Sequence, residues 1–380
     1  MLYSLKAFSS TTITGATSTL GRSARALGAL TLTRRRRRTT IQDVARLAGV
    51  SNGAVSLALS GQTGVADSTR ARIIAAADQL GWRPSIGARA LLSSRAFAVG
   101  LILARDPELI GADPFFPSFI AGVEAELTKR RYSLVLHVVP DEPQAEGEAY
   151  RRLAQEGRVD GVFLTDLHRD DRRIALVQKL ELLAIAIGSP SPAAPIPSIG
   201  IDDGVGVHEA VRHLLSLGHA RIAFVGGTPA YVHSASRLAA WRQAHRQGGV
   251  TPGRVVTADF TGTGGAAATA RLLAGPDRPT AIVYANDLMA IAGMSVAAQR
   301  GIDVPGQLSI VGFDDIALAA HMHPPLTTVR QDVPGWGRAA AAALLSLIEG
   351  GEVESTTLPP PKLVRRETTG PPPDPDRRAA

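Results

Sequence analysis

The sequence predicts an α/β protein in which a small three-helix unit precedes a core of two α/β lobes with a cleft between them. Over residues 39–81, apolar residues recur at helical spacing between turn and capping residues. From residue 98 onward, seven short apolar runs alternate with amphipathic helical segments, the pattern of parallel sheets covered on both faces. Seven runs are many for one sheet, so we expect two lobes.

The three-helix unit is predicted from its helix ends. Thr40, followed three residues later by Asp43, is typical of a helix N-terminus. Gly49 is expected to end the first helix, and Ser51 to cap the second. A third helix, beginning near residue 67, should end at Gly81. The apolar residues between these ends allow the three helices to pack together.

The predicted strands of the core are the apolar runs AVGLIL (98–103), LVLHVV (134–139), GVFLT (161–165), LAIAIG (183–188), RIAFVGG (221–227), AIVYAND (281–287) and LSIVGFDD (308–315). The clearest predicted helices are PSFIAGVEAELTKR (117–130), GVHEAVRHLLSLG (206–218) and GRAAAAALLSLIEG (337–350).

Composition excludes several classes of protein. With 380 residues, the chain can form two or three domains. It has no cysteine, which excludes disulfides, thiolate metal sites and a cysteine nucleophile. The sequence contains no run of 18 apolar residues, so no transmembrane helix is predicted. The N-terminus also lacks the continuous apolar core of a secretory signal. We therefore expect a cytoplasmic protein.

Positive charge is concentrated at the N-terminal end. Residues 1–95 contain 14 Lys and Arg and 3 Asp and Glu, a net charge of +11, whereas the remainder carries −4. This asymmetry predicts a polyanion-binding module on an acidic body. Five of these charges form the run Arg34–Arg38, which could bind phosphates or be a solvated linker. Without residues 1–38, the segment 39–95 still carries +3.

Several segments of the sequence resemble the LacI/GalR family of bacterial transcriptional regulators, in order and over roughly residues 39–368. They are TIQDVARLAGVSNGAVSLAL (40–59), GWRPSIGARALLSSR (81–95), FFPSFIAGVEAEL (115–127), LLSLGHARIAFVGG (214–227), SRLAAWRQA (236–244), YANDLMAIAG (284–293), SIVGFDD (309–315) and PPLTTVRQDVPGWGRAA (324–340). The resemblance implies an N-terminal helix-turn-helix DNA-binding domain, a hinge helix and a core like that of periplasmic sugar-binding proteins.

In the family, the first residues of the second helix face the DNA bases, and here these are Asn52 and Gly53. Asn52 can pair bidentately with adenine, although it could instead be a second capping residue. Ser51 and Ser56 suit phosphates or weak base contacts. Leu57 replaces a polar or basic reader and could contact a thymine methyl group. We therefore expect this helix to make few contacts with base edges. Thr40 is the remaining residue of the three-helix unit that is predicted to contact DNA.

The hinge is expected to supply further specificity. The resemblance places the segment IGARALLSS in the minor groove, with Leu91 as the wedge between central base pairs. Arg89 and Leu92 are the other predicted contacts. The alternative is an ordinary linker with one exposed leucine.

The resemblance also implies an effector site between the lobes. Its predicted residues are Phe115, Phe116, Arg237, Asn286, Asp314 and, in a strand between the lobes, Gln331. Aromatic rings covering C–H surfaces, with Arg, Asn and Asp bonding hydroxyl groups, suit a sugar. Core packing for the phenylalanines and strand-end capping for Asp314–Asp315 remain alternatives. Asp202 and Asp203 are weaker candidates.

No catalytic constellation is predicted. GVGVHE (204–209) lacks the third glycine of a dinucleotide-binding motif, and no phosphate-binding loop is present. His321 and His323 have no other ligand nearby in the sequence, so a loop role is favoured over a metal site. No cofactor is expected.

We therefore expect a DNA-binding transcriptional regulator, a homodimeric repressor of a near-palindromic operator, controlled by a small ligand such as a sugar. A solute-binding protein, an α/β enzyme and a regulator with decayed DNA specificity are the alternatives. The expected segments are a disordered basic extension (1–38), the helix-turn-helix domain (39–83), the hinge helix or linker (84–96), the two-lobed effector-binding and dimerisation core (97–368) and a disordered tail (369–380). A transit peptide or a misplaced start codon could also explain residues 1–38.

Overall fold

The computed structural model describes residues 39–59, 64–83, 95–105, 107–190 and 194–374. The chain divides into two compact units, Met1–Pro84 and Ser85–Ala380. Among the described residues, no helix is both long and apolar enough to cross a membrane.

The first unit consists of α1 (Ile41–Ala48), α2 (Asn52–Leu59) and α3 (Asp67–Gln79). Each helix contributes a fully buried side chain to a common core: Val44, Val55 and Ile73. The Asp43 carboxylate accepts hydrogen bonds from the backbone and hydroxyl of Thr40, so the predicted start of α1 is confirmed.

The first lobe of the second unit is a six-stranded parallel sheet in the order β11-β5-β4-β3-β1-β2. In chain order its strands are β1 (Ala98–Ala104), β2 (Ser133–Val139), β3 (Gly161–Leu164), β4 (Leu183–Ile187), β5 (Ser198–Gly200) and β11 (Thr356–Thr357). Its helices are α5 (Pro107–Ala112), α6 (Phe115–Leu127), α7 (Pro143–Gln155), α8 (Arg172–Lys179) and α13 (Val333–Ile348), with a 3-10 turn η1 (Thr128–Arg130) after α6.

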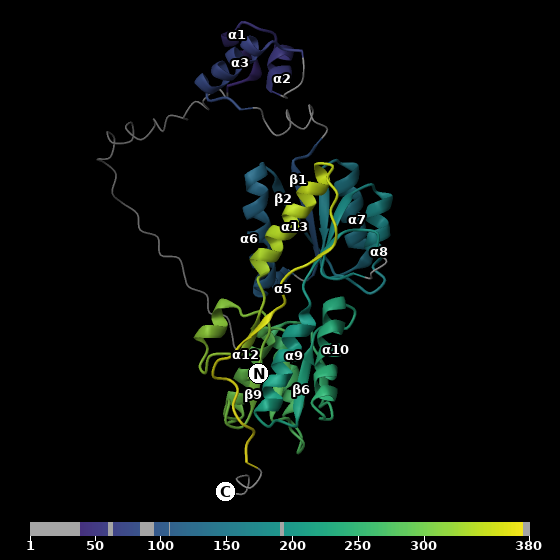
Figure 1. Ribbon diagram of the computed structural model, residues 1–380, viewed down its shortest axis with the longest axis vertical. Helices are drawn as coiled ribbons and strands as arrows, with labels where there is room; N and C mark the ends of the chain where they lie inside the picture. The colour runs from purple at the N-terminus through teal and green to yellow at the C-terminus, as the bar shows by residue number, and fades with distance from the viewer. Residues whose placement is uncertain (1–38, 60–63, 84–94, 106, 191–193, 375–380) are drawn as a thin grey trace, which may run out of the picture. The chain divides into compact units, whose positions relative to one another are not determined.

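Helices cover both faces of this sheet. Helices α6 and α13 lie side by side on one face, and α7 and α8 lie on the other (Figure 1). Each face has its own apolar core. Strands buried on both faces must be apolar throughout, as β1 and β3 are.

The second lobe is a four-stranded parallel sheet in the order β7-β6-β8-β9. Its strands are β6 (Ile222–Gly226), β7 (Val255–Thr257), β8 (Ala281–Tyr284) and β9 (Ser309–Val311). Its helices are α9 (Asp203–Ser216), α10 (Val232–Gln247), α11 (Gly262–Leu272) and α12 (Asp287–Gln299), with a 3-10 turn η2 (Ala317–His321). Helices α9 and α10 pack together, as do α11 and α12.

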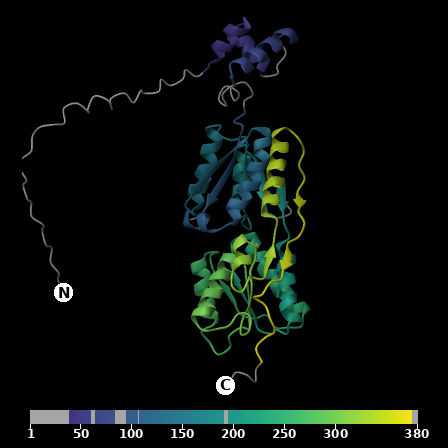
Figure 2. The ribbon, with the colours of Figure 1, turned by 90° about the vertical axis from the view of Figure 1, so that its left-hand side faces the viewer.

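The chain passes between the lobes more than once. It leaves β5 for α9, returns from β10 (Thr328–Arg330) to α13, and leaves β11 for β12 (Lys362–Val364) (Figure 2). Strands β10 and β12 form an antiparallel pair. The cleft is therefore bordered by several crossing segments of one chain.

All seven predicted strands are present, but two predictions extended too far. Residues 281–287 do not form one strand, because Asn286 caps α12 and Asp287 begins that helix. The run 308–315 ends its strand at Val311, and Asp314 and Asp315 have positive φ angles of 117° and 55°. Apolarity alone does not show where a strand gives way to a cap or turn.

Two smaller differences concern chain ends and crossings. Gln331 does not lie in a strand, because β10 ends at Arg330. The expected tail begins inside the second lobe, since Thr369 contacts His213 and Gly370 contacts the buried His219. The sequence also did not predict the short strands β5, β7, β10, β11 and β12.

Candidate functional site

The exposed start of α2 is the candidate DNA-reading surface. Ser51 Oγ accepts a hydrogen bond from Ala54 N at 3.2 Å, so Ser51 caps the helix as predicted. Asn52 and Gly53 are exposed in the first turn, whereas Ser56 and Leu57 are half-buried. Because Ser51 already supplies the cap, Asn52 is not needed as a second capping residue.

Three of the four arginines described in this unit have partners within it. Arg46 and Arg83 form ion pairs with Asp43 and Asp78, and Arg70 donates to the carbonyl oxygen of Ala58. Thr40 is exposed at the start of α1. The predicted hinge residues Arg89, Leu91 and Leu92 lie outside the described residues.

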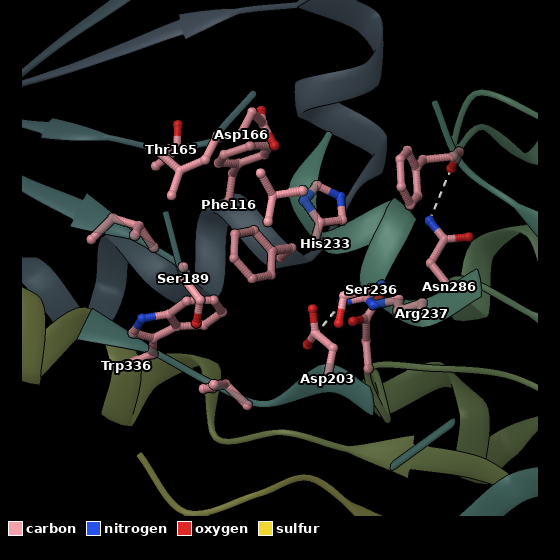
Figure 3. A pocket seen from close by; sticks show the side chains of 18 of the residues that line it. Phe116, Thr165, Asp166, Ser189, Asp203, His233, Ser236, Arg237, Asn286 and Trp336 are labelled. Atoms are coloured by element: carbon pink, nitrogen blue, oxygen red, sulfur yellow. Dashed lines mark hydrogen bonds and ion pairs between the residues drawn. The ribbon is translucent and has the colours of Figure 1, made fainter. Parts of the chain in front are cut away.

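The second candidate site is a cavity of about 490 Å³ between the two lobes (Figure 3). Its volume lies within the range of about 300–1,000 Å³ found for small-molecule sites. Residues after β1, β3 and β4 and from α6 and α13 contribute from the first lobe; residues from α9, α10 and the ends of β8 and β9 contribute from the second. The lining residues are Arg105, Asp113, Phe115, Phe116, Thr165, Asp166, Leu167, Ile187, Gly188, Ser189, Ile201, Asp202, Asp203, Val232, His233, Ser236, Arg237, Phe260, Asn286, Asp314, Trp336 and Thr357.

Sheet topology explains this location. Parallel strands end at the same edge of a sheet, and open α/β sheets bind ligands beyond their carboxyl ends. Arg105 directly follows β1 and Asp166 follows β3, the strand beside it. Asn286 follows β8 in the same way. The cavity therefore collects polar side chains from the carboxyl ends of both sheets.

Arg237 is the central cation of the second lobe. Its Nη1 donates to the carbonyl oxygen of Ala285 at 2.6 Å, and its Nη2 lies 3.4 Å from Asp203 Oδ1. The guanidinium also stacks 3.8 Å from the ring centroid of Phe313. These contacts hold a buried cation in one orientation at the cavity wall.

Arg105 is the cation of the first lobe, and Asp166 binds it through two hydrogen bonds. Arg105 Nε and Nη2 donate to the Asp166 carboxylate at 2.8 and 2.7 Å. The guanidinium also faces rings of both lobes, since it lies 5.2 Å from the Phe116 centroid and 5.3 Å from that of Tyr231.

The lobes also contact each other directly beside the cavity. Val232 N of the second lobe donates to the Leu167 carbonyl oxygen of the first at 2.8 Å. The rings of His168 and Tyr231 meet edge to face, with centroids 5.2 Å apart. These contacts join the two lobes on one side of the cavity.

Burial shifts the pKa values of several lining groups. It raises the pKa of Asp113, Asp203 and Asp314 above the ordinary aspartate value. It also lowers the pKa of His233 to about 3, assisted by the positive charge of Arg237, so this imidazole is neutral at physiological pH. Burial would raise the pKa of Asp166, but the adjacent Arg105 lowers it below its ordinary value.

The cavity contains five of the six predicted effector residues: Phe115, Phe116, Arg237, Asn286 and Asp314. Gln331 does not line it. Its Nε2 instead donates to Asp314 Oδ1 at 2.6 Å, so Gln331 orients the Asp314 carboxyl group without lining the cavity itself. The weaker candidates Asp202 and Asp203 also line the cavity.

Other lining residues were not predicted, chiefly Arg105, Asp113, Asp166, His233 and Trp336. The position of Arg105 and Asp166 after predicted strands was the available signal. Trp336 lies in α13, late in the chain, and its indole Nε1 donates to the carbonyl oxygen of Ile199 at 2.7 Å. Nothing local in the sequence shows that this helix joins the first lobe.

The remaining histidines show no metal-binding arrangement. His208 and His213, five residues apart, contact Gln247 and Thr369. Across the described ranges, no group of three or more His, Asp or Glu side chains could hold a metal ion.

A helix-turn-helix unit joined to a two-lobed, periplasmic-binding-protein-like core defines a class of DNA-binding regulators. Residues 40–85 match the family description of bacterial regulatory proteins of the lacI family, and residues 211–369 match that of periplasmic binding protein-like domains. The transcriptional regulator CelR of Thermobifida fusca is 32% identical over 320 residues, 83% of this chain and 94% of that protein. The chain belongs to the LacI family of bacterial regulatory proteins.

Solved structures agree with this assignment. A CelR–cellobiose complex is 31% identical, with a TM-score of 0.67, and covers 87% of this chain and 100% of its own. A lac repressor dimer bound to operator and the anti-inducer ONPF is 28% identical, with a TM-score of 0.77 and coverages of 88% and 100%. The α/β fold class is confirmed, and the protein is a DNA-binding transcriptional regulator. Its relatives are transcriptional regulators, which confirms the prediction that it is not an enzyme.

Proposed function

We propose that the protein is a ligand-controlled repressor that binds a near-palindromic operator in the bacterial cytoplasm and carries a sugar-like effector between its lobes. The observation that carries this proposal is the combination of an exposed α2 N-terminus with a separate polar and aromatic cavity. The α2 N-terminus is suited to DNA and the cavity to a small ligand, so ligand binding at one site can control DNA binding at the other.

We assign DNA contacts to Thr40, Ser51, Asn52, Gly53, Ser56 and Leu57 of residues 39–83, and to Arg89, Leu91 and Leu92 of the hinge at 84–96. Asn52 is the main base reader, because Asn can bond both N6 and N7 of adenine. The effector is assigned to residues 97–368, with Phe115, Phe116, Arg237, Asn286 and Asp314 in contact and Gln331 behind Asp314.

We propose a sugar because the cavity combines rings with paired carboxyl, amide and guanidinium groups. Phe115, Phe116 and Trp336 form an aromatic cluster on the first-lobe side, with Phe115 centroids 5.3 Å from Phe116 and 5.9 Å from Trp336. Rings suit the C–H faces of a pyranose, and polar side chains suit its hydroxyl groups. Cellobiose in the CelR complex is consistent with this assignment.

Ligand binding is proposed to change the relative positions of the lobes and thereby the operator affinity. Lobe closure would alter two contacts between the lobes, the Leu167–Val232 hydrogen bond and the packing of His168 on Tyr231. A ligand can shift operator binding only if it binds the two lobe arrangements with different affinity.

We also propose that the functional form is a homodimer that uses strand β2. This strand is at the edge of the first sheet and exposes Leu136 and Val138, which are 43% and 41% accessible. Unpaired edge strands with exposed apolar side chains favour association. Replacing both residues with Glu should produce monomers in light-scattering measurements, with weaker operator binding; an unchanged dimer would assign the interface elsewhere.

The decisive experiment is selection of bound fragments from randomised and host genomic DNA with the purified full-length chain at about 0.15 M salt. We expect a near-palindrome whose half-sites lie about one helical turn, or a multiple of it, apart. Adding uncharged sugars to the recovered operator should then release the protein. Retention that is only unspecific and salt-sensitive would instead indicate a regulator with decayed specificity.

A further inference from the structure

Carboxyl groups outnumber guanidinium groups around the cavity. Among the described residues that line it, five are aspartates and two are arginines. His233 adds no charge at neutral pH, because burial lowers its pKa to about 3. An anionic ligand would thus enter a site that already holds more carboxyl groups than guanidinium groups, and like charges in a desolvated site repel strongly.

The first-lobe cation is not free to neutralise an anion. Phosphate and carboxylate are best recognised by two parallel N–H groups of one guanidinium. Arg105 directs that edge, Nε and Nη2, at both oxygens of Asp166, at 2.8 and 2.7 Å. Its face is covered by the rings of Phe116, Tyr231 and Phe260. Asp166 therefore occupies one of the two edges of Arg105 that present paired N–H groups, and it offsets the positive charge that an anionic ligand would use.

The second-lobe cation has a buried nitrogen whose N–H has no partner. Arg237 is 7% exposed, and its Nη1 and Nη2 contact Ala285 and Asp203. Its Nε is buried without a hydrogen-bond partner. A buried N–H with no partner is costly, so a ligand atom is its natural acceptor.

Two carboxyl groups have unfilled acceptor capacity. Asp113 accepts from Phe115 N at 3.0 Å, and Asp314 accepts from Gln331 Nε2 at 2.6 Å. Neither forms an ion pair within the part of the chain that the structure describes. A carboxylate can accept about four hydrogen bonds, so both groups can accept further hydrogen bonds from a ligand. Hydroxyl groups of a ligand supply donors without bringing negative charge.

We propose that the cavity selects an uncharged, hydroxyl-rich sugar and rejects its phosphorylated or carboxylated counterpart, and that Asp166 is a specificity-determining positioning residue because it occupies Arg105. This proposal rests on the proposed function of the same cavity as the effector site. Asp113 and Asp314 can accept further hydrogen bonds from a ligand, and Arg237 Nε can donate one.

The first test is calorimetric titration of the full-length chain with uncharged mono- and disaccharides, including glucose and cellobiose, each beside its phosphorylated and acid counterparts. Inorganic phosphate is the probe for the anion alone. The best uncharged sugar should bind about 100-fold more tightly than its phosphate, because like-charge contacts cost several kcal/mol. Tighter binding of an anionic member, or no binding by any uncharged sugar, overturns the proposal.

The second test separates a specificity role of Asp166 from a structural one. D166N keeps the shape and suits the backbone, since Asp166 has φ 48° and Asn tolerates this region. It leaves the Arg105 charge unpaired, so the ratio of phosphorylated to uncharged affinity should rise about 10-fold or more. In R105Q/D166N neither charge is present, and the ratio should return toward the wild-type value.

Controls keep this test decisive. D332N changes an aspartate that caps α13 outside the cavity, and should leave the affinity ratio unchanged. If D166N does not fold, D113N is the second variant. Removing this carboxyl group should also raise the ratio of phosphorylated to uncharged sugar affinity. An unchanged ratio in whichever of these folds contradicts the proposal.

The two proposals fail in different ways. If a phosphorylated sugar binds best and releases the operator, the effector function stands and the selectivity is wrong. If uncharged sugars bind selectively but never change operator affinity, the selectivity stands and the proposed control of DNA binding is wrong.

Discussion

At the residue scale, the proposed base contacts depend on very few side chains. The start of α2 exposes Ser51, Asn52 and Gly53, and Ser51 caps the helix. Since Gly53 has no side chain to donate or accept, the proposed direct base readout on this turn comes mainly from Asn52. A helix that recognises its operator through one base contact should lose most of its direct readout when that contact is removed.

N52A should therefore reduce operator affinity by about 1–3 kcal/mol, the discrimination of one bidentate pair, with little change for unrelated DNA. Fluorescence anisotropy with both duplexes measures this difference. An equal loss on both duplexes would mean that Asn52 contacts phosphates or supports the fold, so the thermal unfolding of N52A is the control.

The buried imidazole of His233 makes stability depend on pH. Its pKa is about 3 in the folded protein and about 6.5 when unfolded, so the unfolded chain binds the proton more readily. Stability contributed by the neutral ring is present above pH 6.5 and is lost as pH falls toward 3.

Lowering the pH from 7.5 to 5 should thus destabilise the wild type by about 1–2 kcal/mol more than H233Q, whose side chain does not titrate. Urea unfolding at the two pH values gives this difference. Parallel losses in both proteins would show that other groups control the acid response.

At the element scale, the packing of α6 on α13 depends on two glycines that face each other. A Cβ at Gly122 would lie 2.1 Å from the Pro334 carbonyl oxygen, and one at Gly337 would lie 2.3 Å from the Phe119 carbonyl oxygen. Both clashes are with backbone, which cannot rotate away. The contact joins a helix at the start of the core to one near its end, so it stabilises the whole first lobe.

G122A and G337A should each destabilise the core by about 1–3 kcal/mol through overpacking. The matched control is G111A in α5, where a Cβ would have no neighbour within 4 Å and the better helix propensity of Ala should make the change neutral or slightly stabilising. Chemical denaturation compares the three. A wild-type midpoint for G337A would show that the helices separate at little cost.

At the scale of the whole molecule, DNA and ligand sites must affect each other reciprocally. If a sugar lowers operator affinity by some factor, operator must lower sugar affinity by the same factor. Titrating sugar calorimetrically with and without saturating operator measures both sides of this balance. Equal sugar affinities under the two conditions would contradict control of DNA binding by this ligand.

Electrostatic attraction to DNA should depend on residues that precede the described part of the chain. Residues 39–95 carry a net charge of only +3, whereas Arg34–Arg38 carry five positive charges. Comparing the full chain with residues 39–380, the slope of log affinity against log salt should become shallower by about 0.9 for each phosphate that these arginines neutralise. Identical slopes would make this run a solvated linker.

Much of the architecture could be predicted from sequence because it is encoded locally. Continuous apolar runs identify strands buried on both faces, and Thr40, Ser51 and Gly81 mark helix ends through their own backbone preferences. Five cavity residues were also predicted, but by resemblance to a family, since neither periodicity nor composition places Arg237 beside Asp314. Predictions were poorest at strand ends, where Asp287 turned out to begin a helix.

By itself, the sequence determined the order of the elements, the two-lobed α/β class and the start of the reading helix, because these depend on neighbouring residues. Only the tertiary structure decided that Arg105 meets Asp166, 61 residues away, through the adjacency of β1 and β3. It also decided that Trp336 returns to the first lobe. Charge pairing inside the cavity depends on strand order and chain crossings, which no local pattern specifies.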